Sequence, residues 1–146
     1  MSRNRLMDFE SIDRFVRGGN AYFTVVNPDS GSRYTFRVSQ RENENGEKSP
    51  FFVGVLRGPD NTSHYQYLGV IFDGKTYRHT AKSRISNGAP SAHCFEWFWK
   101  VLTARSQKAL DRVEVWHEGR CAVCGRKLTV PASIESGIGP VCDGRI

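Results

Sequence analysis

The sequence predicts an α+β fold: an antiparallel β-meander of about five strands packed by one main helix, plus a C-terminal zinc knuckle or treble-clef-like finger. Short strand-like runs separated by turn sequences predict the meander, because strands joined by tight turns pair antiparallel. One long segment with apolar residues at helical spacing predicts the helix. Three cysteines and a histidine grouped near the C-terminus predict the finger.

The first half of the chain reads as one helix followed by five strands. Apolar residues recur every three or four positions over residues 6–18, which predicts a short amphipathic helix ending at Gly18-Gly19. Turn sequences such as Asn45-Gly46 and Asp73-Gly74 then separate the strand-like runs. The strands are expected at residues 21–26, 34–38, 51–56, 65–72 and 76–79.

The main helix is expected to begin at Pro90-Ser91 and to end near Ala104. Its apolar stripe would cover one face of the sheet, and Trp97 and Trp99 widen that stripe, so we expect the helix to be buried on more than one side. Residues 105–112 are expected to be a polar connector and 113–117 a short strand. The predicted domains are an α+β domain at 1–112 and a zinc-finger domain at 113–146.

The C-terminal cluster of metal ligands consists of His117, Cys121, Cys124 and Cys142. Three thiolates and one imidazole complete a tetrahedral zinc shell with no vacant position, which is typical of a structural site and not of a catalytic one. A Cys-x2-Cys pair followed by glycine is typical of a zinc knuckle, because Gly125 tolerates the positive φ that the tight turn requires. The sequence therefore predicts one structural Zn²⁺.

Two alternatives to this ligand set are open from the sequence alone. Cys121 and Cys124 could form a disulfide or redox pair, although glycine directly after the second cysteine disfavours the helix that follows a thioredoxin-like pair. The fourth ligand could also be His93 or Cys94 instead of His117. Cys94 lies on the apolar stripe of the predicted helix, where a small buried hydrophobe is the simplest interpretation.

Residues of the finger form a dense motif: Cys121-Ala-Val-Cys124-Gly125-Arg126-Lys127-Leu128-Thr129, then Ser133-Ile134-x2-Gly137-Ile138-Gly139-Pro140-x-Cys142. This stretch resembles the uncharacterised zinc-finger family DUF6011. Upstream, 58–61, 65–69, 82–85 and 89–92 look like the N-terminal part found with that domain in bacteriophage and prophage proteins. The resemblance implies a phage accessory protein and favours His117 as the ligand that precedes the knuckle, but it implies no activity.

The chain carries no recognisable catalytic constellation, and we expect it not to be an enzyme. His64 and Asp60 lie in one predicted loop without a serine or cysteine placed beside them by any motif. The sequence contains no phosphate-binding loop, no HExxH motif and no zinc-deaminase pattern. A closed zinc shell also leaves no position for an activated water.

The formal net charge of +6 favours a polyanionic partner. We expect nucleic acid, single-stranded DNA or RNA, because its binding combines cations for the phosphates with aromatic faces for the bases. The simpler interpretation of each aromatic residue is that it packs beneath the main helix. The candidate contact residues are Lys75, Arg78, Lys82, Arg84, Arg120, Arg126 and Lys127.

The predicted strands supply the aromatic residues for such a surface. Tyr22, Tyr34, Phe36, Phe51, Phe52, Tyr65, Tyr67 and Tyr77 alternate with Arg33, Arg37, Arg57 and Arg78.

The alternative function is a protein-binding module that docks on a host protein and modulates it, for example an inhibitor of a host defence system of the anti-CRISPR kind. No small-molecule substrate is evident. The start of the chain lacks a signal-peptide core, and no run reaches the roughly 18 apolar residues of a membrane helix. We therefore expect a cytoplasmic protein without membrane contact, in the host cell if it is phage-encoded.

Overall fold

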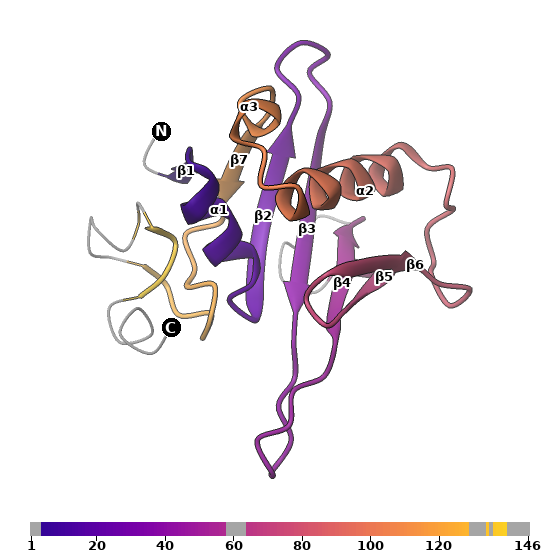
Figure 1. Ribbon diagram of the computed structural model, residues 1–146, viewed down its shortest axis with the longest axis vertical. Coiled ribbons are helices and arrows are strands. Elements are labelled where there is room, and N and C mark those ends of the chain that lie inside the picture. The colour runs from indigo at the N-terminus through magenta and orange to yellow at the C-terminus, as the bar shows by residue number, and fades with distance from the viewer. Residues whose placement is uncertain (1–3, 58–63, 129–133, 135, 140–146) are drawn as a thin grey trace.

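The computed structural model describes residues 4–57, 64–128, 134 and 136–139. In this part of the chain seven strands form one sheet in the order β1-β7-β2-β3-β4-β5-β6, and every neighbouring pair is antiparallel (Figure 1). Helices in the described residues are all too short or too polar to cross a membrane. The elements are β1 (Arg5–Leu6), α1 (Phe9–Val16), β2 (Asn20–Val26), β3 (Arg33–Ser39), β4 (Phe51–Leu56), β5 (Tyr65–Phe72), β6 (Thr76–His79), α2 (Pro90–Thr103), α3 (Gln107–Leu110) and β7 (Glu114–His117).

The five-strand antiparallel meander is confirmed as β2 to β6, and β4, β5 and β6 have the predicted bounds. Two further strands extend the sheet: β1, and β7, which confirms the short strand expected at residues 113–117. β7 returns from the last helix and inserts between β1 and β2, with Val115 paired to both Leu6 and Val25. The predicted domain boundary after residue 112 therefore falls just before a strand of the main sheet. β7 and the segment after it are joined to that sheet by backbone hydrogen bonds.

The first helix is shorter than predicted because a capping residue sets its start. Asp8 adopts an extended conformation, and its carboxylate accepts hydrogen bonds from the backbone N–H (3.2 Å) and hydroxyl (2.8 Å) of Ser11. The pKa of the Asp8 carboxyl is lowered, mainly by the hydrogen bond from the Ser11 hydroxyl. Leu6, which helical periodicity assigned to this helix, lies instead in β1. The 105–112 segment, expected to be a connector, contains the single-turn helix α3.

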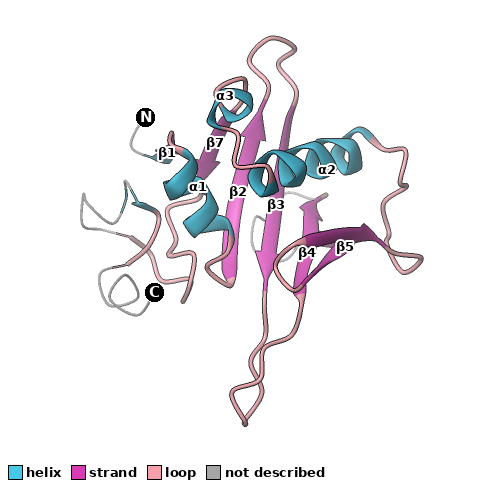
Figure 2. Cartoon of the chain, viewed as in Figure 1, coloured by secondary structure: helices cyan, strands magenta, loops and turns pink. Residues whose placement is uncertain are grey.

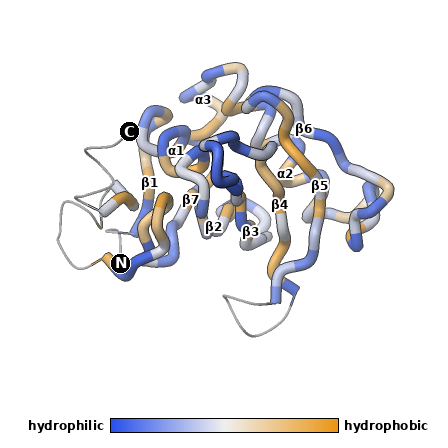
Figure 3. The backbone as a smooth tube through the Cα atoms, turned by 90° about the horizontal axis from the view of Figure 1, so that it is seen from below, coloured by the Kyte–Doolittle hydropathy of each residue, from blue (hydrophilic) through white to orange (hydrophobic). Residues whose placement is uncertain are grey.

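All three helices lie on one side of the sheet, and the core fills the space between (Figure 2). Phe23 of β2 and Phe36 of β3 pack against Phe98 and Phe95 of α2, with ring centroids 5.5 and 5.2 Å apart. Phe15 of α1 reaches the same layer at 6.3 Å from Phe23. Figure 3 shows hydrophobic segments in the strands and helices, with the hydrophilic β3–β4 connection pointing towards the viewer.

α2 buries less of its surface than its sequence predicts. Trp99 is buried at 3% exposure, and its indole N–H donates to the carbonyl of Lys75 at 2.8 Å. Trp97, two residues earlier, is 36% exposed. Because two residues turn a helix by about 200°, only one of these indoles can face the sheet. The helix is therefore buried along one side, and Trp97 belongs to its outer side.

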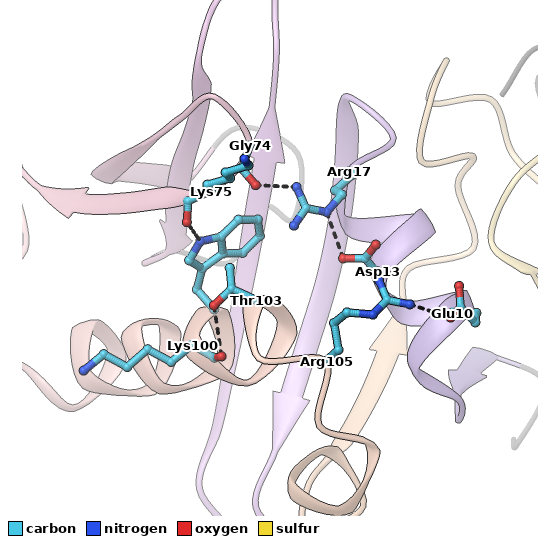
Figure 4. Close-up of polar contacts among 9 residues, drawn as sticks. Glu10, Asp13, Arg17, Gly74, Lys75, Lys100, Thr103 and Arg105 are labelled. Atoms are coloured by element: carbon cyan, nitrogen blue, oxygen red, sulfur yellow. Dashed lines mark hydrogen bonds and ion pairs between the residues drawn. The ribbon is translucent and has the colours of Figure 1, made fainter.

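Arg17 links α1 to the β5–β6 turn and to α2 (Figure 4). Its guanidinium donates to the carboxylate of Asp13 (2.8 Å) and to the carbonyl of Gly74 (2.5 Å), and it lies 4.8 Å from the ring centroid of Trp99. Arg105 forms an ion pair with Glu10 whose two side chains are 65% and 76% exposed, and its guanidinium lies 4.6 Å from the ring centroid of Phe9. Arg17 therefore joins three elements, whereas Arg105 makes a solvated pair.

We expect Arg17→Ala to lower the free energy of unfolding by about 1–3 kcal/mol, because it removes hydrogen bonds made by a charged group in a partly buried place. Arg105→Ala should cost less than about 1 kcal/mol, since exposed ion pairs contribute little. Urea denaturation followed by circular dichroism measures both. Equal losses of unfolding free energy in the two variants would contradict the conclusion that Arg17 joins three elements whereas Arg105 makes a solvated pair.

Candidate functional site

The knuckle, residues 119–128, is a tight hairpin that follows β7. Arg120 and Lys127 form a bridge pair, and the N–H of Cys121 donates to the carbonyl of Arg126 at 2.8 Å. Gly125 has φ +80°, as the sequence predicts, and its N–H donates to the carbonyl of Cys121 at 2.9 Å. The turn places Cys121 in the buried core and leaves Cys124 exposed.

Backbone N–H groups surround the sulfur of Cys121. Sγ accepts from the N–H of Gly139 at 3.2 Å and from that of Val123 at 3.4 Å. Burial raises the pKa of this thiol, but the hydrogen bonds from Gly139, Cys124 and Val123 outweigh burial and bring the pKa down to about 7. This environment favours a thiolate, the form that zinc binds. The turn therefore fits the donor chemistry of a metal knuckle.

His117 is held by the backbone through both ring nitrogens. Nδ1 accepts from the N–H of Gly119 at 2.9 Å, so the proton lies on Nε2, which donates to the carbonyl of Ile134. Burial lowers the pKa of the ring, opposed by the Ile134 contact, and the imidazole lies 5.7 Å from the ring centroid of Phe15. His117 would have to exchange one backbone partner in order to ligate a metal.

The other predicted ligands are placed differently. His93 and Cys94 line a groove beside Val25, whereas the knuckle meets the opposite end of β2, where the N–H of Asn20 donates to the carbonyl of Ala122 at 2.7 Å. Five residues of strand, roughly 17 Å, separate those two ends. Cys142 lies outside the described residues, and within the described part of the chain no three potential ligands meet. Cys121 and Cys124 are thus the pair that the structure brings together.

The sheet face opposite the helices carries rows of aromatic and arginine side chains, and we call it the open face. No helix among the described residues covers it. Strand register aligns its side chains in cross-strand rows. The central row is Tyr22–Arg37–Gly54–Tyr67. The row that contains the residue two positions before Tyr22 is Asn20–Ser39–Phe52–Val70–Arg78. The row that contains the residue two positions after Tyr22 is Arg5–Trp116–Thr24–Thr35.

A compact cluster of two tyrosines and two arginines occupies the middle of the open face. The guanidinium carbons of Arg37 and Arg120 lie 5.2 and 5.6 Å from the ring centroid of Tyr22. The ring of Tyr65 meets Tyr22 edge-on at 5.6 Å. Burial, as the main cause, raises the pKa of Tyr65, so its phenol stays neutral and can donate a hydrogen bond.

The strand register shows which face of the sheet each aromatic residue occupies, which the sequence alone could not. Phe36, Phe51 and Tyr77 face the helices, and Tyr77 contacts Phe95 at 5.0 Å. Phe52 is 39% exposed, and the register places it on the open face, 6.4 Å from Tyr67. Tyr34, paired with Val25 and packed against the core, also lies on the helix side, so packing beneath the helix is correct for Phe36, Phe51, Tyr77 and Tyr34 but not for Phe52.

The seven cations predicted from the sequence lie in two groups. One is at the β6 edge and the other in the knuckle beyond β7 (Figure 1). The row from Tyr22 to Tyr67 crosses the strands between the two groups. The members are Lys75, Arg78, Lys82 and Arg84 in the first group, and Arg120, Arg126 and Lys127 in the second.

Sequence reasoning missed a polar hollow of about 820 Å³ on the open face. The Thr24 and Thr35 hydroxyls line it and lie 2.7 Å apart, and the Trp116 indole donates to Glu114 at 3.0 Å. Arg33 also lines the hollow. Side chains alternate between the two faces along a strand, so this pattern in β2 and β3 could have placed Thr24, Thr35 and Arg33 on one face. The return of β7, which brings Trp116 beside Thr24, has no local signal in the sequence.

Comparison with protein-family models gives a match in the C-terminal part of the chain. No curated protein and no solved structure gave a match. One family model matches, over β7, the knuckle and the residues that follow. Residues 114–146 match DUF6011, a family of unknown function.

Proposed function

We propose that this protein binds single-stranded nucleic acid across the open face of its sheet, without catalysing a reaction. The observation that carries the proposal is the row Tyr22–Arg37–Gly54–Tyr67 with Phe52 beside it. Tyr22 is 8% exposed and holds the guanidinium groups of Arg37 and Arg120 over its ring, so the rings open to bases are those of Phe52, which is 39% exposed, and half-buried Tyr67. Aromatic faces stack on bases of any sequence, and guanidinium groups neutralise phosphates.

Charge supports this choice of ligand. Arginines at positions 5, 33, 37, 78 and 120 lie on or against the open face, where Glu114 and Glu118 are the acidic residues of the hollow. The whole chain has a net charge of +6. A strand that crosses the sheet from the knuckle to β6 would meet cations at both ends and aromatic rings between them. Binding should therefore depend strongly on salt.

In this proposal the knuckle is structural. One Zn²⁺ would be held by Cys121 and Cys124 together with Cys142, and the fourth ligand would be His117 after it releases a backbone partner. The sulfur environment of Cys121 supports metal binding, and the family resemblance supports a phage-type accessory protein that acts in the cytoplasm of its host cell. The ion would fix the turn that holds Arg120 over Tyr22.

The first test concerns charge. Arg33→Glu combined with Arg78→Glu, both exposed on the open face, should weaken binding of a fluorescein-labelled dT or U 20-mer by at least about tenfold at low salt, because each reversal replaces a phosphate contact by repulsion. Phe52→Ala should weaken it by roughly 5- to 150-fold through lost stacking. Fluorescence anisotropy over a salt series measures both effects.

The control is the same charge reversal on the helix side of the molecule. Lys100 of α2 and Lys108 of α3 are both exposed there, and Lys100→Glu with Lys108→Glu changes the net charge equally. This control should bind far better than the open-face variant. Equal losses would mean that net charge alone attracts the oligonucleotide. If binding is absent and a single host protein is retained regardless of salt, the protein-binding alternative is favoured, including inhibition of a host defence system.

A further inference from the structure

A groove of about 600 Å³ lies on the helix side of the sheet, between the β2–β3 turn and the first half of α2. Val25, Tyr34 and Cys94 supply its apolar lining, and Trp97 and Arg112 line it as well. Figure 1 shows that the β2–β3 turn projects past α2 and α3. The groove is on the opposite side of the sheet from the open face, and none of these residues falls in the segment matched by DUF6011.

The groove is preformed, because hydrogen bonds hold its turn wall. The N–H of Asn27 donates to the carbonyl of Ser32, and the N–H of Gly31 donates to the carbonyl of Asn27, both at 2.8 Å. The side-chain carbonyl of Asn27 accepts from the N–H of Asp29 at 3.0 Å. A regular helix forms the other wall. A ligand that enters the groove therefore need not order its walls, which lowers the entropic cost of binding.

Trp97 is available for contact with a partner. Phe95, Phe98 and Trp99 of the same helix all contact other aromatic rings, whereas Trp97 has no ring or hydrogen-bond partner among the described residues. Cys94, one turn earlier, keeps the lining neutral, because burial raises the pKa of its thiol to about 11. The indole thus stands beside the apolar lining supplied by Val25, Tyr34 and Cys94.

Arg112 places a cation at one end of the groove. It is exposed, and its guanidinium makes no hydrogen bond or ion pair within the described part of the chain. Asp29 also lines the groove, and the carboxylate of Asp111, next to Arg112 in sequence, accepts a hydrogen bond from the side chain of Gln107 at 2.8 Å. Because a free guanidinium binds a carboxylate with two parallel hydrogen bonds, the Arg112 end of the groove is suited to an acidic group.

We propose that this groove binds an extended peptide segment of a partner protein in which a bulky apolar side chain stands next to Asp or Glu. The apolar side chain packs between Trp97 and Tyr34, and the carboxylate pairs with Arg112. Tryptophan, tyrosine and arginine are the residues that dominate the energetics of protein interfaces, and a polar rim around an apolar centre is their usual anatomy. Ser30, Ser32 and His93 supply that rim. The site acts independently of nucleic-acid binding.

The test begins with a library of displayed random peptides selected on the full chain. Selected peptides should share an aromatic or large aliphatic residue within two positions of Asp or Glu. Fluorescence anisotropy of the best peptide should show a loss of at least about 30-fold for Trp97→Ala and for Arg112→Ala. Lys100→Ala, an exposed change on α2 outside the groove, should leave affinity unchanged.

Charge reversal gives a readout that a folding defect cannot mimic. Arg112→Glu should lose the acidic peptide and gain affinity for the same peptide with Lys in place of its acidic residue. Trp97→Ala and Arg112→Ala should bind the labelled oligonucleotide as the wild type does, so this proposal and the proposed function can fail separately. Enrichment of no peptide, or equal binding by Trp97→Ala, would overturn the proposal. Self-association in sedimentation that Trp97→Ala abolishes would also overturn it, by assigning the groove to a second copy of the chain.

Discussion

Cys124→Ser is expected to abolish the binding of one zinc ion per chain, whereas Cys94→Ser should leave it unchanged. Cys124 lies in the turn whose backbone N–H groups surround the sulfur of Cys121, and Cys94 lines a groove at the far end of β2. Both are conservative changes of a thiol to a hydroxyl, so the pair isolates the knuckle from the rest of the chain. Elemental analysis of protein purified without chelator measures the stoichiometry.

Loss of the metal should also destabilise the sheet and not the tail alone. Cys121, Ala122 and Ile138 are core residues with at most 1% exposure, and Ala122 is hydrogen-bonded to β2. A structural zinc ion contributes on the order of 10 kcal/mol of apparent binding energy. Cys124→Ser should therefore lower the temperature of one cooperative transition measured by calorimetry. A wild-type protein without zinc, or a variant that retains it, would contradict the zinc proposal.

Gly137→Ala is expected to lower the free energy of unfolding by about 2 to 5 kcal/mol, the sum of left-handed backbone strain and overpacking. Gly137 has φ +76°, and a methyl group there would lie 2.4 Å from the ring of Phe15. That ring is fully buried between α1 and the sheet, so it has no room to move. Chemical denaturation of the variant measures the loss.

Gly31→Ala is the matched control for this substitution. Gly31 has nearly the same backbone conformation, φ +77°, but nothing lies within 4 Å of the added methyl group. The control should lose only the strain contribution of about 1–2 kcal/mol. If both variants lose the same free energy, the close approach of the C-terminal segment to Phe15 does not contribute to stability.

Local sequence signals were sufficient for most of the elements. Asp73-Gly74 marked the turn between β5 and β6 so well that both strands have the predicted bounds, and β4 has them too, whereas Asn45-Gly46 lies within the longer connection between β3 and β4. The positive φ of Gly125 and the tight turn of the knuckle were predictable for the same reason. Errors arose where a distant partner competed with periodicity. Leu6 satisfies a helical pattern but pairs with Val115, more than a hundred residues away.

The candidate site was only partly predictable. Residue types showed that aromatic and basic side chains were concentrated in the strands, but Tyr77 and Phe52 look alike in sequence and face opposite sides of the sheet. Arg33 and Arg37 were named from the sequence as arginines that alternate with the aromatic residues, but the rows that they form with neighbouring strands depend on the register. Trp97 and Trp99 could not be told apart until the sheet fixed the direction of the helix.

The sequence by itself determined the antiparallel meander, the main helix and the Cys-x2-Cys turn, because each depends on contacts between residues close in the chain. Only the tertiary structure decided that β7 enters the sheet beside β2, that one face, with Arg37 between tyrosines, is left uncovered by the helices of the described residues, and that His117 is held by two backbone groups. Those features depend on register and on long-range burial. Local propensity carries no information about which distant segment supplies the partner.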